Sequence, residues 1–357
     1  MKFKHFYLFL CCLILAGGSC PVFAAGFPWK QLSKQPDAWY QSDEAKEKAQ
    51  NVLDYQTKYG DWPKNIDTSQ KYQDGDSDRH GGTFDNSATL NEMRFLAKMY
   101  RFTPNPEYKE AVLKGINHVL QAQYENGGWP QRFPVSPTSY EHHITFNDDA
   151  MTNIMQFLRD VEQFPDFAFV EESCREKIRD AFSKGIQCIL TCQVRQGGRL
   201  TVWCAQHDHE TLQPEKARSY ELPSLSGGES ANIIRFLMSL ENPTPEIVQA
   251  VNAAAKWYED SKITGIRQIT VDGDKKIIAD ADAPPLWARF YELETNRPFF
   301  CGRDGIVKYD ISEIEAERRN GYSWYTTSGE KVAREWAQWK DKNGLTNSSP
   351  IEQFRPE

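Results

Sequence analysis

The chain has 357 residues, of which 50 are acidic and 42 are basic, so its formal net charge is −8 and its pI is about 5.5. This length is enough to bury one large hydrophobic core. The acidic balance argues against nucleic acids and anionic membranes as partners, because an acidic protein repels polyanions. An acidic substrate would need cationic side chains or a metal ion placed locally.

The first 24 residues are predicted to be an export signal. Lys2 and Lys4 precede the apolar run FYLFLCCLILAGG, which is short for a membrane span, and Ala24 closes a small-residue cleavage site. Residues 25–357 would then form a single domain, periplasmic or secreted, that we expect to act as a monomer. The alternative is a lipoprotein cleaved before Cys20, but no apolar branched residue stands three positions before that cysteine.

An internal sequence repeat extends along the chain as far as about residue 240. The segments DYQTKYGDWPKN, QAQYENGGWPQR and TCQVRQGGRLTVW each place a Gln before a Gly-containing turn and then a Trp. The glutamines are Gln56, Gln123 and Gln193, spaced 67 and 70 residues apart. Such a period is typical of repeated helix hairpins with long loops. The tryptophans are expected to pack the repeat turns rather than to stack on sugar rings.

Helices are predicted on both sides of each turn. A helix with 3.6-residue apolar periodicity precedes the turn, and a polar loop and a second helix follow it, as in NEMRFLAKMYR, AMTNIMQFLRDVEQF and ESANIIRFLMSL. The sequence therefore predicts a fold dominated by α-helices, an (α/α)3 toroid. After about residue 260, alternation around Asp272-Gly273-Asp274 predicts a small β-hairpin elaboration of the same domain.

Two polar clusters precede the second helices of the first two repeats. TFDNSAT contains Asp85 and Asn86, and TFNDDAM, 62 residues later, contains Asp148 and Asp149. Carboxylate and amide oxygens on loops are ligands that calcium prefers. The simpler interpretation of any single Asp here is helix capping. The third copy reads Gly-Gly-Glu and has diverged at this position.

Other polar residues give weaker signals. Arg218 follows Lys216-Ala217 in a loop that contains proline. Arg289 has aromatic neighbours in the sequence, and Arg303 lies in the segment Gly302-Arg303-Asp304-Gly305. The pairs His142-His143 and His207/His209 could bind metal but lack a known ligand spacing, so packed or solvated histidines are the simpler interpretation. Serine-hydrolase and nucleotide-binding motifs are absent from the sequence.

The sequence resembles the family-10 pectate lyases. The motifs that carry the resemblance, in order along residues 54–310, are TFDNSAT, ENGGWPQRFP, HITFNDDAM, CAQHDHETLQPEKARSYELPSLSGGES and FCGRDG. The resemblance implies a secreted (α/α)3 toroid that cleaves polygalacturonate by calcium-dependent anti β-elimination, as an endo-acting lyase. It also implies a role for each candidate residue: Arg218 as Brønsted base, Asp148 and Asp149 as calcium ligands, Asp85 and Asn86 beside calcium and substrate, and Arg289 and Arg303 binding substrate carboxylates.

This set of residues suits the chemistry that the resemblance implies. Removing the C5 proton of a galacturonate builds negative charge on its carboxylate, where calcium and guanidinium groups are most useful. An arginine base is unusual, because the guanidinium pKa is normally about 12.5 to 13.8. The alternative is that Arg218 stays charged and binds the developing enolate while hydroxide takes the proton.

Two other functions remain open from the sequence. One is an inverting glycoside hydrolase, with Asp148 or Asp149 as base and Glu221 or Asp85 as acid. The other is a carbohydrate-binding protein that has kept the fold without catalysis.

Overall fold

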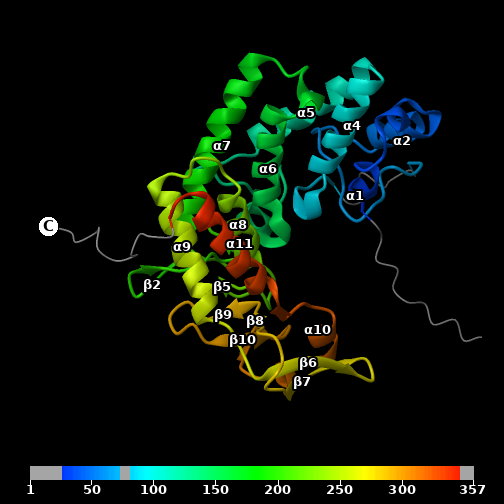
Figure 1. The fold of residues 1–357 in the computed structure, drawn as a ribbon. Coiled ribbons are helices and arrows are strands. Elements are labelled where there is room, and N and C mark those ends of the chain that lie inside the picture. Colours follow the sequence, from blue (N-terminus) through cyan, green and yellow to red (C-terminus); the bar gives the residue numbers. More distant parts are fainter. Residues whose placement is uncertain (1–25, 73–80, 346–357) are drawn as a thin grey trace, which may run out of the picture.

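The computed structural model describes residues 26–72 and 81–345 (Figure 1). The predicted export signal, residues 1–24, and the alternative lipidation site, Cys20, lie outside these residues. Within the described ranges, no helix combines the length and the apolar character needed to cross a membrane.

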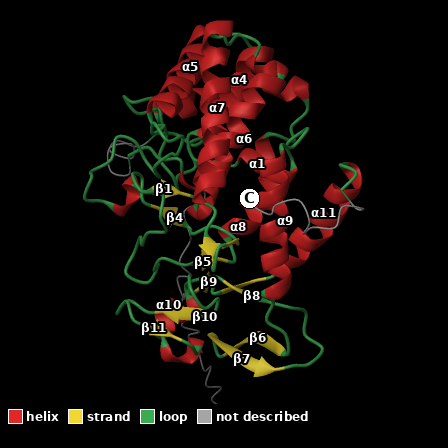
Figure 2. Cartoon of the chain, turned by 90° about the vertical axis from the view of Figure 1, so that its left-hand side faces the viewer, coloured by secondary structure: helices red, strands yellow, loops and turns green. Residues whose placement is uncertain are grey.

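The helices form two layers, which confirms the prediction of a fold dominated by α-helices. One layer contains α2, α5, α7 and α9, the other contains α4, α6, α8 and α11, and neighbours pack within and between layers (Figures 1 and 2). The longer helices are α2 (Asp43–Asp54), α4 (Leu90–Phe102), α5 (Pro106–Gln121), α6 (Ala150–Gln163), α7 (Glu172–Cys192), α8 (Glu229–Met238), α9 (Pro245–Asp260) and α11 (Ser328–Lys342), and the short ones are α1 (Trp29–Leu32) and α10 (Ala316–Asn320). Closure of these layers into a toroid stays a prediction.

The helix starts follow from local sequence. Asn105 and Thr244 accept hydrogen bonds from backbone amides of the first turn of α5 and α9, and each is followed by a proline at the first helical position. Ser42 caps α2 in the same way. Buried aliphatic and aromatic residues from these helices form one continuous core, which extends from Leu32 to Trp339.

The repeated glutamines and tryptophans hold each turn in the same way. The Nε2 of Gln123 donates to the carbonyls of Gly127, in its own turn, and Ala181, on the next helix of the layer, at 3.0 and 2.8 Å. Gln56 and Gln193 make the equivalent pair of bonds. The three tryptophans are fully buried, and each indole N–H donates to a carbonyl of the preceding helix, on Val52, Val119 and Ile189. The repeat and the packing role of its tryptophans are therefore confirmed.

Short strands build a second lobe below the helices in Figures 1 and 2. A four-stranded sheet has the order β11 (Val307–Lys308), β10 (Pro298–Cys301), β9 (Phe290–Tyr291) and β5 (Leu225–Ser226). Neighbouring strands in this sheet are antiparallel. A cluster that includes Phe290, Phe299, Phe300 and Trp324 forms its core. The predicted hairpin is present as β6 (Ile266–Val271) and β7 (Asp274–Ala279). The remaining pairs are β1 (Ile144–Thr145) with β4 (Gln206–His207), β2 (Arg195–Gln196) with β3 (Arg199–Leu200), and β8 (Trp287–Ala288) with β12 (Tyr325–Thr326).

Candidate active site

The two predicted polar clusters occupy matching turns. Asp85–Ser87 and Asn147–Asp149 are single 3-10 turns directly before α4 and α6, and the two turns contact each other. Asn86 and Asp148 are equivalent in the repeat, and both adopt a left-handed backbone, with φ of 54° and 50°. Non-glycine residues rarely take this conformation without a functional or structural reason. Here it leaves both side chains exposed at the surface of the turns.

Asp85 lies beneath them and is 1% exposed. Its Oδ2 accepts hydrogen bonds from Lys64 and, at 2.7 Å, from the Nε2 of Gln131. Lys64 and Gln131 both follow a Trp-Pro pair and are equivalent in the repeat. The Oδ1 of Asp85 is buried and has no hydrogen-bond partner among the described residues. A buried carboxylate oxygen without a partner is costly, and a cation would satisfy it.

The diverged third repeat also contributes a carboxylate. Glu229 begins α8 and is 6% exposed, and its Oε1 accepts a 2.5 Å hydrogen bond from Nη2 of Arg289. The same Nη2 lies 3.0 Å from Oδ1 of Asn147, so Arg289 joins the second and third repeats. Arg289 therefore lies inside the acidic cluster, and its role in binding a substrate carboxylate stays a prediction.

Asp148 and Asp149 differ in their surroundings. Both oxygens of Asp149 accept bonds from the Asn232 amide at 2.9 Å. Asp148 keeps contact with solvent, and among the described residues Asn147 alone donates to it. Partial burial, followed by the nearby charges of Asp85 and Glu229, raises the pKa of Asp148 to about 6. The nearby carboxylates therefore repel the negative charge of Asp148, and a bound cation would offset this repulsion.

Arg218 is held by Glu221. Its Nε and Nη2 donate to the two carboxylate oxygens at 2.7 and 2.5 Å, and its backbone N–H donates to the same group. These bonds raise the pKa of the guanidinium above its already high ordinary value. Burial alone would raise the pKa of the Glu221 carboxyl, but the bonds from Arg218 hold it below its ordinary range. The Arg218 guanidinium is 4.9 Å from the centre of the Tyr220 ring, which supports it from one side.

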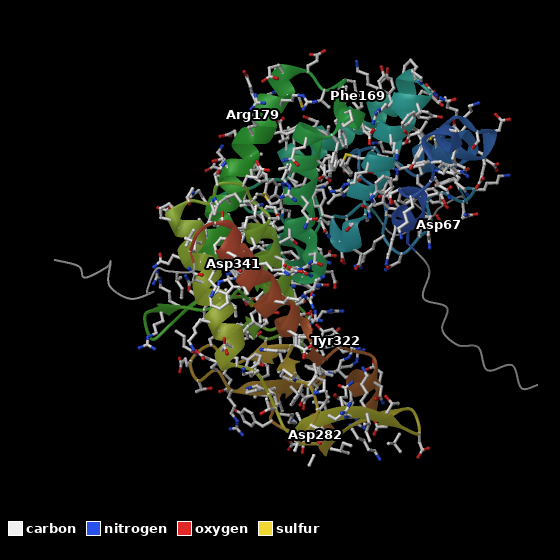
Figure 3. All side chains as sticks on the ribbon, viewed as in Figure 1. Asp67, Phe169, Arg179, Asp282, Tyr322 and Asp341 are labelled. Atoms are coloured by element: carbon white, nitrogen blue, oxygen red, sulfur yellow. The ribbon has the colours of Figure 1, made fainter. Side chains whose placement is uncertain are left out.

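Tyr322 connects Arg218 to the acidic cluster. Its hydroxyl donates to Glu221 at 2.7 Å, while the guanidinium of Arg289 lies 4.4 Å from its ring centre. It lies where the helices meet the β lobe (Figure 3). Burial raises the pKa of Tyr140, whose hydroxyl also experiences the charges of Arg218 and Asp85. Arg218 and the two acidic turns therefore belong to one continuous polar site.

Arg303 lies at the edge of this arrangement. Its side chain is 58% exposed and pairs with Glu317 through two 3.0 Å bonds. Its guanidinium is 5.9 Å from the Tyr220 ring centre, on the aromatic group that also supports Arg218. This ring connects Arg303 to the site.

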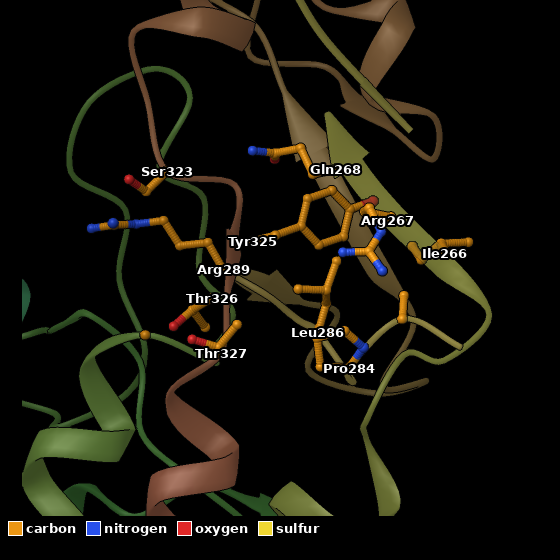
Figure 4. Close-up of a pocket in the computed structure, with 12 residues that line it drawn as sticks. Ile266, Arg267, Gln268, Pro284, Leu286, Arg289, Ser323, Tyr325, Thr326 and Thr327 are labelled. Atoms are coloured by element: carbon orange, nitrogen blue, oxygen red, sulfur yellow. The ribbon is translucent and has the colours of Figure 1, made fainter. Parts of the chain in front are cut away.

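A pocket of about 570 Å³ adjoins the site and does not cover the acids. It is bordered by Arg289, Tyr325 and the hairpin residues Arg267 and Gln268. In Figure 4 the Arg289 side chain extends away from Arg267, and its guanidinium belongs to the acidic cluster described above. We therefore place the reacting groups beside Arg289, on the acidic side, rather than in this pocket.

Sequence reasoning missed several residues of this site. Lys64 and Gln131 could have been found by aligning the Trp-Pro pairs of the repeats, because both bind Asp85. Glu229 could have been found by treating Gly-Gly-Glu as a functional copy of the cluster. Tyr322 carries no local signal, since its role depends on contacts across the fold.

Comparison with known proteins gives the site its context. The family model described as pectic acid lyase matches residues 56–333. The chain is similar to a solved structure of a family 10 polysaccharide lyase from Cellvibrio cellulosa, with 37% identity and a TM-score of 0.74, over 88% of this chain and 98% of that one. A mutant of a family 10 polysaccharide lyase from the same organism, in complex with trigalacturonic acid, matches with 37% identity and a TM-score of 0.73, over 85% and 96%. No curated protein sequence gave a significant match.

The family match covers most of the chain and agrees with the resemblance found in its motifs. Both solved structures are matched over nearly their whole lengths. The chain therefore belongs to the pectic acid lyase family, and it is a lyase that acts on polysaccharides.

Proposed function

We propose that the protein is a pectate lyase that cleaves α-1,4-polygalacturonate by calcium-assisted anti β-elimination. The observation that carries the proposal is the continuous site that joins Arg218, through Glu221 and Tyr322, to Arg289 and the acidic turns. A similar enzyme was solved with trigalacturonic acid, which supports a galacturonate chain as substrate. Cleavage would release 4,5-unsaturated oligogalacturonides.

The residues of the acidic cluster fit a calcium ion. Four carboxylates, on Asp85, Asp148, Asp149 and Glu229, are accompanied by two hydrogen-bonded cations, Lys64 and Arg289. The unsatisfied Oδ1 of Asp85 and the solvent-accessible Asp148 are hard oxygen donors of the kind that calcium takes. Asp148 and Asp149 would hold the ion, with Asp85 and Asn86 beside it. When bound, calcium supplies positive charge that stabilises the carboxylate of the galacturonate being deprotonated.

The protein's own residues act on the substrate as follows. A base takes the C5 proton, and the electron pair of the broken C5–H bond forms the C4–C5 double bond. The C4–O bond breaks at the same time, and the oxygen of the leaving chain takes a proton from water. Guanidinium groups stabilise the negative charge that develops on the C6 carboxylate. Arg289 lies closest to the acidic residues, and Arg303 lies further out. These contacts strengthen as charge develops, so they lower the barrier more than they strengthen ground-state binding.

Arg218 has two possible protonation states in this reaction. As the Brønsted base it would have to lose its proton, and the bonds from Arg218 to Glu221 oppose that loss. We therefore favour the charged form at neutral pH, in which Arg218 stabilises the developing enolate and hydroxide accepts the C5 proton. The base role requires Arg218 to separate from Glu221 first.

The hydrolase alternative fits the site less well. Glu221 was the candidate acid, but the guanidinium of Arg218 lowers its pKa, which keeps it ionised. Asp85, the other candidate acid, is buried and bonded to Lys64. A general acid needs a proton to donate, and the environment of Glu221 does not favour one.

We also propose, as the sequence predicts, that residues 25–357 form one catalytic domain, an (α/α)3 toroid that is exported and acts as a monomer. The support for one domain is that a single core extends from Leu32 to Trp339 and includes Trp287 and Tyr291 of the β lobe.

The activity is tested by incubating the protein with polygalacturonate, with calcium or with EDTA. We expect the ultraviolet absorbance of unsaturated products to rise with calcium and to stop rising after EDTA is added. New reducing ends without this absorbance would show hydrolysis. Retention on the polymer without turnover would show a binding protein.

A further inference from the structure

Three histidines from two loops come together outside the proposed active site. Each offers a ring nitrogen within 4.8 Å of the others, on His142, His143 and His209. The ring of His142 lies 4.2 Å from that of His143 and 4.8 Å from that of His209, centre to centre. These histidines have no metal-ligand spacing in the sequence, because the pairing of β1 with β4 brings their two loops together.

The ring nitrogens of this cluster are incompletely satisfied. His143 is 9% exposed, and its Nδ1 has no hydrogen-bond partner among the described residues. The Nδ1 of His209 is also buried without a hydrogen bond. His142 bonds through Nδ1 to the Ser139 carbonyl, which fixes the proton there and leaves the Nε2 lone pair available. Buried nitrogens without partners are costly unless a ligand uses them.

His207, nearby in the chain, shows how this fold satisfies a purely structural histidine. It is fully buried, its Nδ1 lies 2.9 Å from the Leu212 carbonyl and its Nε2 accepts from the Cys204 N–H at 3.1 Å. Both ring nitrogens are used. The simpler interpretation of a packed histidine therefore holds for His207 and leaves the three others unexplained.

We infer that His142, His143 and His209 form a binding site for a divalent transition metal of the zinc class. Three imidazoles suit zinc, whereas calcium takes oxygen ligands, so this site is chemically distinct from the acidic cluster. Two nitrogens bound to one tetrahedral zinc ion at about 2.1 Å lie about 3.4 Å apart. The ring nitrogens, now up to 4.8 Å apart, therefore need to approach one another by roughly 1.4 Å.

The charges around the cluster favour a bound cation. Carboxylates lie close by, with Asp208 4.0 Å from Nδ1 and Glu210 3.9 Å from Nε2 of His209. A water molecule would complete the coordination.

The metal would connect two loops that lead into the proposed active site. His143 directly precedes β1, which leads into the turn with Asp148. His209 lies in a turn that the Asp208 side chain holds through the amides of Glu210 and Thr211, and the chain continues from there to Arg218. A bound ion would therefore stabilise the relative position of these loops, and its binding can be measured without reference to lyase activity.

The test is a zinc titration of the metal-stripped full-length protein, with calcium in excess and a chromophoric chelator as competitor. We expect one zinc per chain and a rise in Tm with zinc. His209→Asn and His142→Asn are expected to weaken zinc binding at least about 100-fold, because each removes a ligand and not merely its support. His209 and His142 are both partly exposed, so these variants are expected to fold.

The matched control is Glu210→Gln, which alters the charge beside His209 but keeps all three imidazoles. Its zinc affinity is expected to stay within about threefold of the wild type, as for a rim charge in a screened setting. The inference fails if the wild type does not compete with the chelator. It also fails if the two histidine variants bind zinc as tightly as the control.

Discussion

Replacing Arg218 with alanine is expected to lower kcat on polygalacturonate about 1,000-fold, the size of effect seen when a charge-stabilising donor is removed from an active site. The fold should survive, because the side chain is 42% exposed. Within the part of the chain that the structure describes, Glu221 is then left with Tyr322 as its single side-chain partner, so a modest loss of Tm is expected as well. The measurement is the initial rate of unsaturated product, with Tm and circular dichroism on the same sample.

Arg179→Ala is the matched control for this experiment. Arg179 also forms ion pairs with glutamates, Glu162 and Glu172, but it lies on α7, far from Tyr322 (Figure 3). Its loss should leave the rate unchanged. If Arg218→Ala kept more than a few per cent of the activity, Arg218 would have no central role.

Glu221→Gln separates the two protonation states of Arg218. If Arg218 is the base, loss of the carboxylate that holds its proton lowers its pKa, and the rate at a given alkaline pH rises. If Arg218 acts as a charged group, the rate falls because its orientation is lost, and the pH profile keeps its position. We expect the second result, since the ion pair favours the charged form.

Asp148→Asn is expected to abolish the effect of calcium on both activity and stability. In the calcium-free protein it should preserve or raise stability at pH 7 and above, because it removes a charge that partial burial and, after it, the nearby carboxylates of Asp85 and Glu229 disfavour, which raises the pKa of Asp148 to about 6. Asp148 keeps solvent access, so this gain is small. The checks are calcium titrations followed by Tm, and the calcium dependence of the rate.

The stability of the calcium-free protein is expected to depend on pH, and the raised pKa of Asp148 fixes the direction of the change. Because the folded pKa of Asp148 is raised, the folded protein binds more protons than the unfolded chain between the ordinary Asp pKa and about 6. Its contribution to stability is therefore lost as the pH rises through that window, and Asp148→Asn should remove this part of the profile. Calcium affinity should rise over the same window in the wild type.

Asp282→Asn is the control, since Asp282 is exposed and lies in the β lobe (Figure 3). It should respond to calcium as the wild type does. A normal calcium response in Asp148→Asn would show that the ion binds elsewhere.

The repeats explain which features could be predicted from the sequence. Gln56, Gln123 and Gln193 recur because each bonds its own turn and a neighbouring helix, so periodicity alone located the hairpins. Asn86 and Asp148 could be paired for the same reason. The β6–β7 hairpin was predictable because its pairing is local.

Features that depend on distant segments could not be predicted. The sheet pairs β5 with β9 although helices α8 and α9 separate them in the chain, and its strands are only two to four residues long. Glu229 was not predicted because Gly-Gly-Glu no longer resembles the other two clusters. In the structure, however, the Glu229 carboxylate accepts a hydrogen bond from Arg289. His209 joins His142 and His143 only after β1 and β4 have paired.

A crystal structure of Arg218→Ala with calcium and trigalacturonic acid tests the central claim most directly. We predict calcium at about 2.3–2.6 Å from oxygens of Asp148 and Asp149. We also predict a galacturonate carboxylate next to this ion, within hydrogen-bonding distance of the Arg289 guanidinium. Calcium at a different place on the protein, or a sugar chain that avoids the acidic turns, would contradict the account.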